Sequence, residues 1–496
     1  MKTDFSTPQR QELRGIVVIY FMTLFTRIRQ NIFVLIPLLS ENIRQNYLHF
    51  VVLGFIALLI FQLVYSYKSY LNFTFYVKDG HFYLKQGIFK ISDIDIPFDR
   101  IQNININQNL IQQMLNVVGV EIETAGKGDA EISIKALSKE NAVALKNLLL
   151  AKKQQTETKE ETSETLELHQ NKSKAVFKLD LTRLLKVGLS SNYLKGFGLV
   201  FAFAATLYQY VSDIVENFLG KNLEEDYVQF PSSFPYIIGF IIFVIVVSFV
   251  VTVASSVIKY FELKVYQLKQ DFEVEYGLFK RINKVIKKEK TQVFEVLENP
   301  ISKLFGIKSL YVSQASSNEL SQKNKIGLVG VGDDEIKILF EALFDLPIGQ
   351  SFIKSSSNFR YGLRLVYRYL ILVIGVAVPV SIFLNLASGI SLGVGLLLVF
   401  GFIAYLQFKK SSIEINEDLI KINSGFIHTK HKYISIYKIQ SVALGRNIFQ
   451  QYNGYADLML YTASGSEKIQ YISTKDAQNI LNYLTYKAES TQLSWI

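Results

Sequence analysis

The clearest candidate for binding chemistry in this sequence is a cluster of cations between positions 280 and 290. The six basic residues of this cluster are Lys280, Arg281, Lys284, Lys287, Lys288 and Lys290, and the single acidic one is Glu289. Each lysine or arginine held near an anionic membrane contributes about 1 kcal/mol of attraction. The cluster therefore predicts contact with anionic lipid headgroups. The alternative is a solvated edge strand, on which lysines prevent pairing with other chains.

Other residue types give little sign of metal binding or catalysis. The chain has no cysteine, which excludes thiolate zinc sites, cysteine nucleophiles and cysteine-held iron–sulfur clusters. Among its 5 histidines only His428 and His431 are close in sequence, and few carboxylates stand near them. The sequence has no P-loop, no Rossmann glycine fingerprint, no nucleophile elbow and no metalloprotease histidine pair. We therefore expect no metal, no cofactor and no enzymatic activity.

The cation cluster belongs to a segment that occurs three times without gaps. Each copy has an anchor glycine, a basic residue thirteen positions later, a glutamine two further on, and an asparagine seven beyond that. These positions hold Gly87, Gly277 and Gly425; Arg100, Lys290 and Lys438; Gln102, Gln292 and Gln440; and Asn109, Asn299 and Asn447. The spacing predicts three superposable domains. The basic residues and glutamines could hold phosphate, but we expect the glutamines and asparagines to satisfy backbone groups where a strand leaves the sheet.

Each copy has the pattern of antiparallel strands followed by one helix. In the first copy Asp79-Gly80 separates two β-favouring runs, which is typical of a type I′ hairpin. Residues 108–116 interrupt the strand pattern and predict a short helix or loop. Ser138 is a helix N-cap, and leucines follow it at helical spacing. We therefore expect each copy to be an antiparallel sheet closed by a C-terminal helix.

Apolar segments precede the three copies, and the mean hydropathy of the chain is +0.21. A helix needs about 20 mostly apolar residues to cross a bilayer. The clear candidates are Leu48–Tyr65, Gly196–Val211, Tyr236–Ile258, Tyr369–Ala387 and Ile390–Phe408. The last two are expected to form a tight hairpin, and Gly389 and Gly393 at its turn form a small-xxx-small pattern that favours close helix packing. These spans carry almost no charge, which disfavours an ion pathway.

The N-terminal region predicts a further, shorter span. Arg27 and Arg29 interrupt the apolar pattern, so we expect Gly15–Thr26 to be an interfacial amphipathic helix with the arginines at the headgroups. Ile32–Leu39 would then begin a short first span. A cleaved signal peptide is the alternative, but no Ala-x-Ala-like site follows the apolar run. One span, a half-span and an interfacial helix all remain open for residues 15–39.

Charge predicts the orientation of the resulting three hairpins. The chain carries 53 Lys+Arg against 43 Asp+Glu, and the basic residues flank the hairpins. The loop inside the second hairpin is acidic, with Asp213, Glu216, Glu224, Glu225 and Asp226 against Lys221. By the positive-inside rule, both termini and all three copies are expected in the cytoplasm.

At this point the chain resembles the YdbT-type family of bacterial membrane proteins, which carry pleckstrin-homology (PH)-like domains in series with paired spans. The resemblance rests on Gly87 and the run Ile96-Pro97-Phe98-Asp99-Arg100-Ile101-Gln102, repeated after hairpin spans. It implies antiparallel PH-like barrels or sandwiches, in which basic residues of early hairpins contact phosphoinositide headgroups. Pro97-Phe98 becomes Lys287-Lys288 and Ser435-Ile436 in the later copies, so a site in one copy need not exist in the others.

The expected organisation alternates membrane and PH-like domains. It consists of an amphipathic lead with the first hairpin (1–66), the first domain (67–153), a disordered linker (154–176), a second lead with the second hairpin (177–258), the second domain (259–346), the third hairpin (347–408) and the third domain (409–496). The linker is polar and charged, with too few apolar residues to bury.

These features predict a multi-pass protein of the bacterial inner membrane whose cytoplasmic PH-like domains form a lipid- or protein-binding scaffold. The resemblance implies a role in envelope integrity or stress defence. Expected partners are membrane lipids, anionic ones above all, and a companion membrane protein or further copies of the chain, but not nucleic acid. The alternatives are a structural oligomeric assembly module with a companion membrane protein, and a lipid transporter. The cation cluster favours the scaffold, and a polar cavity between the spans would favour the transporter.

Overall fold

The structure is a computed structural model. It describes residues 5–30, 41–124, 132–157, 175–191, scattered positions between 193 and 202, and then 234–315, 325–348, 353–383 and 385–490. The chain divides into two compact units. Unit 1 comprises residues 1–173, 191–263 and 274–284, and unit 2 comprises 174–190, 264–273 and 285–496. Each unit is described by itself.

Among the described residues, four helices are long and apolar enough to cross a membrane. They are α2 (Glu41–Leu71), α8 (Phe234–Tyr260), α11 (Phe359–Phe383) and α12 (Leu386–Lys410), and they contain four of the predicted spans. The predicted spans Gly196–Val211 and Ile32–Leu39 fall largely or wholly outside the described residues. Helix α4 ends at Glu157. Of the polar linker predicted at 154–176, residues 158–174 also lie outside the described residues.

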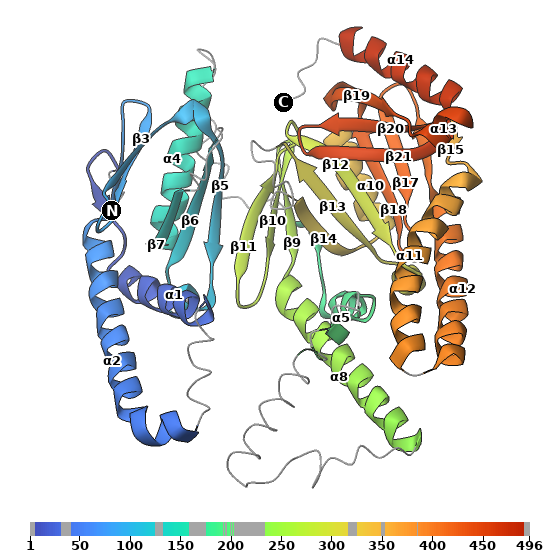
Figure 1. The fold of residues 1–496 in the computed structure, drawn as a ribbon. Helices are drawn as coiled ribbons and strands as arrows, with labels where there is room; N and C mark the ends of the chain where they lie inside the picture. Colours follow the sequence, from blue (N-terminus) through green and yellow to red (C-terminus); the bar gives the residue numbers. More distant parts are fainter. Residues whose placement is uncertain are drawn as a thin grey trace. The chain divides into compact units, whose positions relative to one another are not determined.

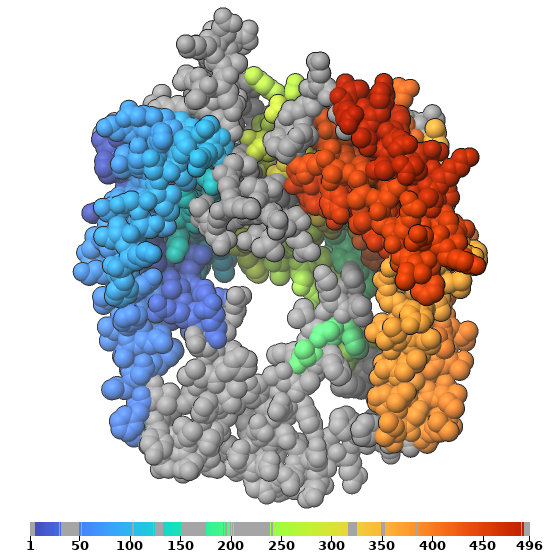
Figure 2. Space-filling model, turned by 45° about the horizontal axis from the view of Figure 1, so that its top comes forward, coloured from blue at the N-terminus to red at the C-terminus, as the bar shows by residue number. Residues whose placement is uncertain are grey.

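The turn of the third hairpin lies earlier in the chain than predicted. The Asn385 side chain caps α12 by accepting a hydrogen bond from the Ser388 amide at 2.8 Å. Because apolar residues continue on both sides of Asn385, hydropathy alone placed the break after Ala387. The predicted close packing is confirmed: a Cβ on Gly389 would lie 2.8 Å from the Ala377 carbonyl oxygen of α11. In Figure 2 the α11–α12 pair (orange) extends away from the third domain (red).

Helix α1 (Gly15–Gln30) begins at the predicted residue and runs four residues further than predicted. Its inner face packs on the first domain, where Val18 is buried with Val117 and Ala136. Its outer face exposes Phe25, at 70% of its surface. Arg27 lies against the Tyr65 ring of α2, 5.2 Å from its centre.

The three copies fold alike, as the spacing predicted. The first contains β2 (Thr74–Lys78), β3 (His81–Gln86), β4 (Ser92–Pro97), β5 (Ile101–Gln108), β6 (Val118–Thr124), β7 (Ile132–Leu137) and α4 (Lys139–Glu157). The second contains β9 (Lys264–Leu268), β10 (Asp271–Tyr276), β11 (Arg281–Ile286), β12 (Thr291–Glu298), β13 (Lys308–Gln314), β14 (Lys325–Val331) and α10 (Asp333–Phe344). The third contains β16 (Ser412–Ile415), β17 (Leu419–Ser424), β18 (Thr429–Ser435), β19 (Ile439–Gly445), β20 (Tyr455–Thr462), β21 (Gly465–Ser473) and α14 (Thr474–Ser490).

Each copy contributes three strands to each of two sheets and ends in a helix, and its described strands do not close into a barrel. In the first domain, alternating residues such as Phe75, Phe82 and Ile122 form a core that includes Leu145 of α4. In the third, α14 covers β19 and β20 (Figure 1) and buries Leu484 against them.

A strand that precedes each hairpin joins the sheet that follows it, which sequence analysis did not predict. These strands are β1 (Gln9–Arg10), β8 (Ala175–Lys178) and β15 (Ile353–Ser356). Their partners include Phe75, Val265 and Ile413, which occupy the same position of the repeat. The residues on the two sides of each predicted hairpin therefore belong to the same sheet.

The sheets of successive copies are also joined to one another. In unit 1, β11 pairs with β5 of the preceding copy, with Arg281 opposite Gln108 and Asn283 opposite Ile106. In unit 2, β18 pairs with β12 in the same way. Strand β11 is therefore not an edge strand, and the alternative of a solvated edge for the cation cluster is wrong.

The repeated asparagines are structural, as expected. Asn109, Asn299 and Asn447 cap the short helices α3 (Leu110–Met114), α9 (Pro300–Leu304) and α13 (Ile448–Tyr452) through capping boxes. These helices are the predicted interruption of the strand pattern. The repeated glutamines do not share one environment, because Gln292 is fully buried and Gln440 is exposed. The basic residues differ as well: Arg100 is exposed, whereas Lys438 is 2% exposed and donates to the Glu289 carbonyl oxygen.

Candidate membrane-contacting site

Three equivalent loops lie at the ends of membrane-spanning helices, and we call residues 87–90, 277–280 and 425–428 the span-end loops. The Asn72 side chain, next to the end of α2, donates to the Gly87 carbonyl oxygen at 2.9 Å. The Leu278 amide donates to the carbonyl oxygen of Ile258 in α8 at 3.0 Å. The Lys410 ammonium, at the end of α12, donates to the Phe426 carbonyl oxygen at 2.7 Å. Each loop is therefore hydrogen-bonded at the end of its own membrane helix.

Each span-end loop exposes an apolar side chain, and in the first two loops an exposed lysine follows it. Phe89 is 89% exposed, Phe279 49% and Ile427 50%. Lys90 and Lys280 follow the first two, whereas His428, which follows Ile427, is half-buried, and burial and the nearby lysines lower its pKa. An apolar side chain next to a cation suits the boundary of a bilayer, where the first enters the acyl region and the second stays at the headgroups.

The anchor glycines are required by the shape of these loops. Gly87, Gly277 and Gly425 have φ values of 119°, 111° and 112°. A Cβ on Gly277 would lie 2.0 Å from the Lys280 carbonyl oxygen, and the other two positions are equally tight. Only glycine adopts this backbone conformation without strain.

The predicted cation cluster extends along β11 and into the turn that follows it. Lys280 and Arg281 are exposed at the membrane end, where Lys259 of α8 is exposed too. The remaining cations, Lys284, Lys287, Lys288 and Lys290, are all half-buried. At about 3.3 Å per residue, the strand separates its two ends by roughly 20 Å.

Only two of the six cations of the cluster are therefore fully exposed. The Lys288 ammonium lies 2.6 Å from the Asp345 carboxylate, and its side chain is 20% exposed. The Lys288 amide also donates to the Asp271 carboxylate at 3.0 Å. Sequence could not show this, because a run of cations does not reveal that its strand lies inside a sheet.

The short capped helices add apolar surface near these loops. Met114, Leu304 and Tyr452 occupy the same position of the repeat and are 80%, 82% and 91% exposed. In unit 1, the Gln113 side chain donates to the carbonyl oxygen of Leu278 at 3.0 Å, so α3 lies beside the second span-end loop. Sequence analysis missed this feature, although the recurrence of large apolar residues in a polar segment was a usable signal.

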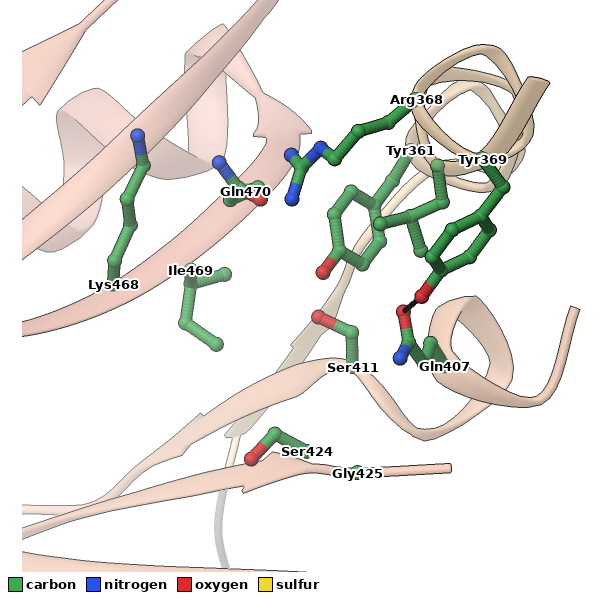
Figure 3. A pocket seen from close by; sticks show the side chains of 11 residues that line it. Tyr361, Arg368, Tyr369, Gln407, Ser411, Ser424, Gly425, Lys468, Ile469 and Gln470 are labelled. Carbon is green, nitrogen blue, oxygen red and sulfur yellow. Dashed lines mark hydrogen bonds between the residues drawn. The ribbon is translucent and has the colours of Figure 1, made fainter. Parts of the chain in front are cut away.

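A polar cavity of about 430 Å³ lies where α11 and α12 meet the third domain. Its lining includes Arg368 and Tyr361 of α11, Ser411 after α12, and Lys468 of β21. Figure 3 shows the Tyr361 hydroxyl and the Arg368 guanidinium directed into it, while the Tyr369 hydroxyl donates to Gln407 at 3.3 Å. These residues come from four separate segments, so sequence analysis could not detect the cavity. It lies at the end of the hairpin next to the third domain.

A buried carboxylate organises the wall of this cavity. The Asp457 side chain is 5% exposed and lies 2.9 Å from the Lys468 ammonium and 3.4 Å from the Arg364 guanidinium. It also accepts hydrogen bonds from the Tyr471 amide at 3.1 Å and from the Gln450 side chain. One carboxylate thus faces two cations and ties α11 to the third domain. When Arg368 is included, three cations face one carboxylate. The net local charge is therefore positive and suits an anionic group.

His431, one of the two histidines considered for a metal, instead links β18 to β17 of the same domain. Its Nδ1 lies 2.5 Å from the Asn423 side-chain oxygen. Among the described residues, no group of three or more potential ligands lies together. Burial and the neighbouring Lys421 ammonium lower the pKa of His431 to about 4.

We expect the third domain to lose stability in mild acid because of His431. In the unfolded chain a histidine has a pKa of about 6.5, so between about pH 6.5 and 4 the unfolded chain binds the extra proton. Stability is therefore retained above pH 6.5 and falls by up to about 3 kcal/mol towards pH 4. Thermal unfolding in detergent at pH 7.5 and 5 measures the effect. His431→Gln should flatten this dependence, and an equal drop in both proteins would contradict the assignment.

Paired membrane helices, strand-linked PH-like sandwiches and span-end loops define a membrane protein with PH-like domains in series. Comparison with known families agrees: the family described as Bacterial PH domain matches residues 31–153, 219–341 and 369–488. Because these matches cover most of the chain, the protein belongs to the bacterial PH domain family. It is also 22% identical to UPF0699 transmembrane protein YdbT of Bacillus subtilis (strain 168), over 97% of this chain and 99% of that protein.

Proposed function

We propose that this protein is a scaffold on the cytoplasmic face of a bacterial inner membrane, and that its PH-like domains bind anionic lipid. The observation that carries the proposal is the repeated span-end loop, which is hydrogen-bonded at the end of its own span and exposes an apolar residue in every copy. In the first two copies an exposed lysine follows that residue. A domain tethered in this way keeps its cations within a Debye length of the membrane, roughly 8–10 Å.

The second loop should make the strongest contribution. Lys259, Lys280 and Arg281 are exposed at the same end of unit 1. At about 1 kcal/mol for each cation, three of them favour anionic over neutral lipid by about 3 kcal/mol, or roughly 100-fold. The cavity lined by Arg368 and Lys468 offers a place for one further headgroup phosphate.

The cytoplasmic placement rests on the basic flanks of the hairpins and on the strands that return to the same sheet. A cysteine introduced at exposed Lys475 tests it, because the chain has no other cysteine. It should resist membrane-impermeant thiol reagents in intact cells and react after lysis. A role in envelope integrity or stress defence, without catalytic activity, is part of the same proposal.

The triple variant K259Q/K280Q/R281Q is expected to lose most of the preference for anionic lipid. Full-length protein in mild detergent is titrated with phosphatidylglycerol and, separately, with phosphatidylethanolamine, and bound lipid is counted by native mass spectrometry. The preference should fall by roughly 100-fold if all three cations contribute fully. Rising salt should weaken it in the parent protein, because the attraction is screened.

The matched control is K284Q/K287Q/K288Q, which removes the same charge from the half-buried part of the cluster. Its lipid preference should stay close to that of the parent. Equal losses in both variants would mean that only net charge matters, and an unchanged K259Q/K280Q/R281Q would reject the second loop as a lipid site.

A further inference from the structure

The two junctions between copies repeat one geometry. Between Gly87 and Gly277 the alignment shifts by 190 residues, and between Gly277 and Gly425 by 148. Applying these shifts to the pair Arg281 and Gln108 gives the pair Thr429 and Glu298, which are opposite each other in the second junction. The first three strands of one copy therefore always attach, in one register, to the last three strands of the copy before it.

This pattern leaves one edge without a neighbour at each end of the series. Within the described residues, β4 is the last strand of its sheet in the first copy, and β19 is the last strand of its sheet in the third. The equivalents of β4 are β11 and β18, and the equivalents of β19 are β5 and β12, all of which are paired. The edge at β4 is thus of the kind that β11 and β18 use in the two junctions, and the edge at β19 is of the kind that β5 and β12 use.

Exposure agrees with this assignment. In β12, residues 294–296, which pair with β18, are buried. In β19 the equivalent residues 442–444 are half-buried. On β4, Asp93 and Asp95 are exposed, and Ile94 between them is half-buried. Long exposed edges of this kind are templates for pairing with another strand.

We propose that β19 of one chain pairs with β4 of a second copy, so that copies of the protein assemble head to tail through a continuous sheet. The repeated register places Ala443 opposite Ile94 and Leu444 opposite Asp93. It also places Arg446 diagonally across from Asp93, where the two opposite charges can interact. This inference is independent of lipid binding.

An interface of this kind uses different surfaces on the two partners. Such heterologous contacts close into a ring or continue as a row, depending on the rotation between copies. Membrane spans in every copy of the repeat restrict the assembly to the bilayer plane. Assembly thereby increases the number of span-end loops that lie together on one membrane.

Cysteine cross-linking in membranes tests the proposal directly, because the natural chain has no cysteine. Ala443→Cys and Ile94→Cys are introduced into separate, differently tagged full-length chains that are expressed together. Leu444→Cys with Asp93→Cys is a second pair, since hydrogen-bonded and non-hydrogen-bonded positions alternate along antiparallel strands. Cα atoms in a disulfide lie about 4.4–6.8 Å apart, so a disulfide requires the proposed register. We expect mixed-tag dimers for at least one pair, and a ladder of larger species when one chain carries both cysteines.

Two controls make each outcome decisive. Lys468→Cys on β21, at the opposite edge of the same sheet, should not cross-link to Ile94→Cys. Leu297→Cys with Lys430→Cys in one chain reproduces an existing junction and should form an internal disulfide, seen by mass spectrometry. Internal disulfides alone from Ala443→Cys/Ile94→Cys would show that one chain closes on itself. That result, or no cross-link in either test pair, would overturn assembly with a second copy.

Discussion

Replacing Asp457 by alanine is expected to lower the stability of the third domain by about 3–5 kcal/mol, the usual cost of removing one partner from a buried ion pair. The carboxylate is 5% exposed and faces both Lys468 and Arg364. Its loss leaves two cations without their shared counter-charge, and the Tyr471 amide without its acceptor. The contact that ties α11 to the third domain is lost as well.

Thermal unfolding of the full-length protein in detergent, together with hydrogen exchange of β20 and β21, measures this effect. The matched control is Glu417→Ala, which removes one carboxylate from an exposed position of the same domain and should change stability by less than about 0.5 kcal/mol. Asp457→Asn should lie between the two, because it retains an acceptor for the Tyr471 amide. Equal stability of Asp457→Ala and Glu417→Ala would refute the central role of this carboxylate.

Gly277→Ala is expected to destabilise the second span-end loop by about 3 kcal/mol, in the upper range for a strained backbone position. Its φ of 111° is unsuitable for alanine, and the added Cβ would lie 2.0 Å from the Lys280 carbonyl oxygen. The loop would have to open, which breaks its hydrogen bond to Ile258 and displaces Lys280 and Arg281. Anionic-lipid preference should therefore fall together with stability.

Gly239→Ala is the matched control, because it lies in α8 of the same copy and a Cβ there meets nothing within 4 Å. Alanine also favours helix over glycine by about 1 kcal/mol, so this variant should be as stable as the parent or more so. Unfolding temperatures of the two variants and lipid titrations provide the comparison. A parent-like Gly277→Ala would show that the loop tolerates another conformation.

The sequence was sufficient to place the repeated domains because their determinants are local. A glycine with φ near 110°, an asparagine that caps a short helix and alternating apolar residues are each set by nearby backbone geometry. The same reasoning located the membrane helices through hydropathy. It erred at Asn385, where one polar residue ended a helix inside an apolar run.

The candidate site was only partly predictable. The cations of the 280–290 cluster are adjacent in sequence, yet Lys280 and Lys288 lie at opposite ends of β11, and only the first is exposed. The cavity beside Arg368 needed residues from four segments that no spacing rule connects. Exposure and proximity depend on which strands cover which, and that is a property of the whole sheet.

The sequence alone thus determined three PH-like repeats, four of the membrane helices and the capped turns, because each follows from the preferences of neighbouring residues. Tertiary structure alone decided that strands before each hairpin return to the sheet, that β11 and β18 attach to the preceding copy, and that β4 and β19 remain as edges. Strand pairing between distant segments depends on backbone hydrogen bonds that every residue except proline can make, so side-chain identity carries little information about it.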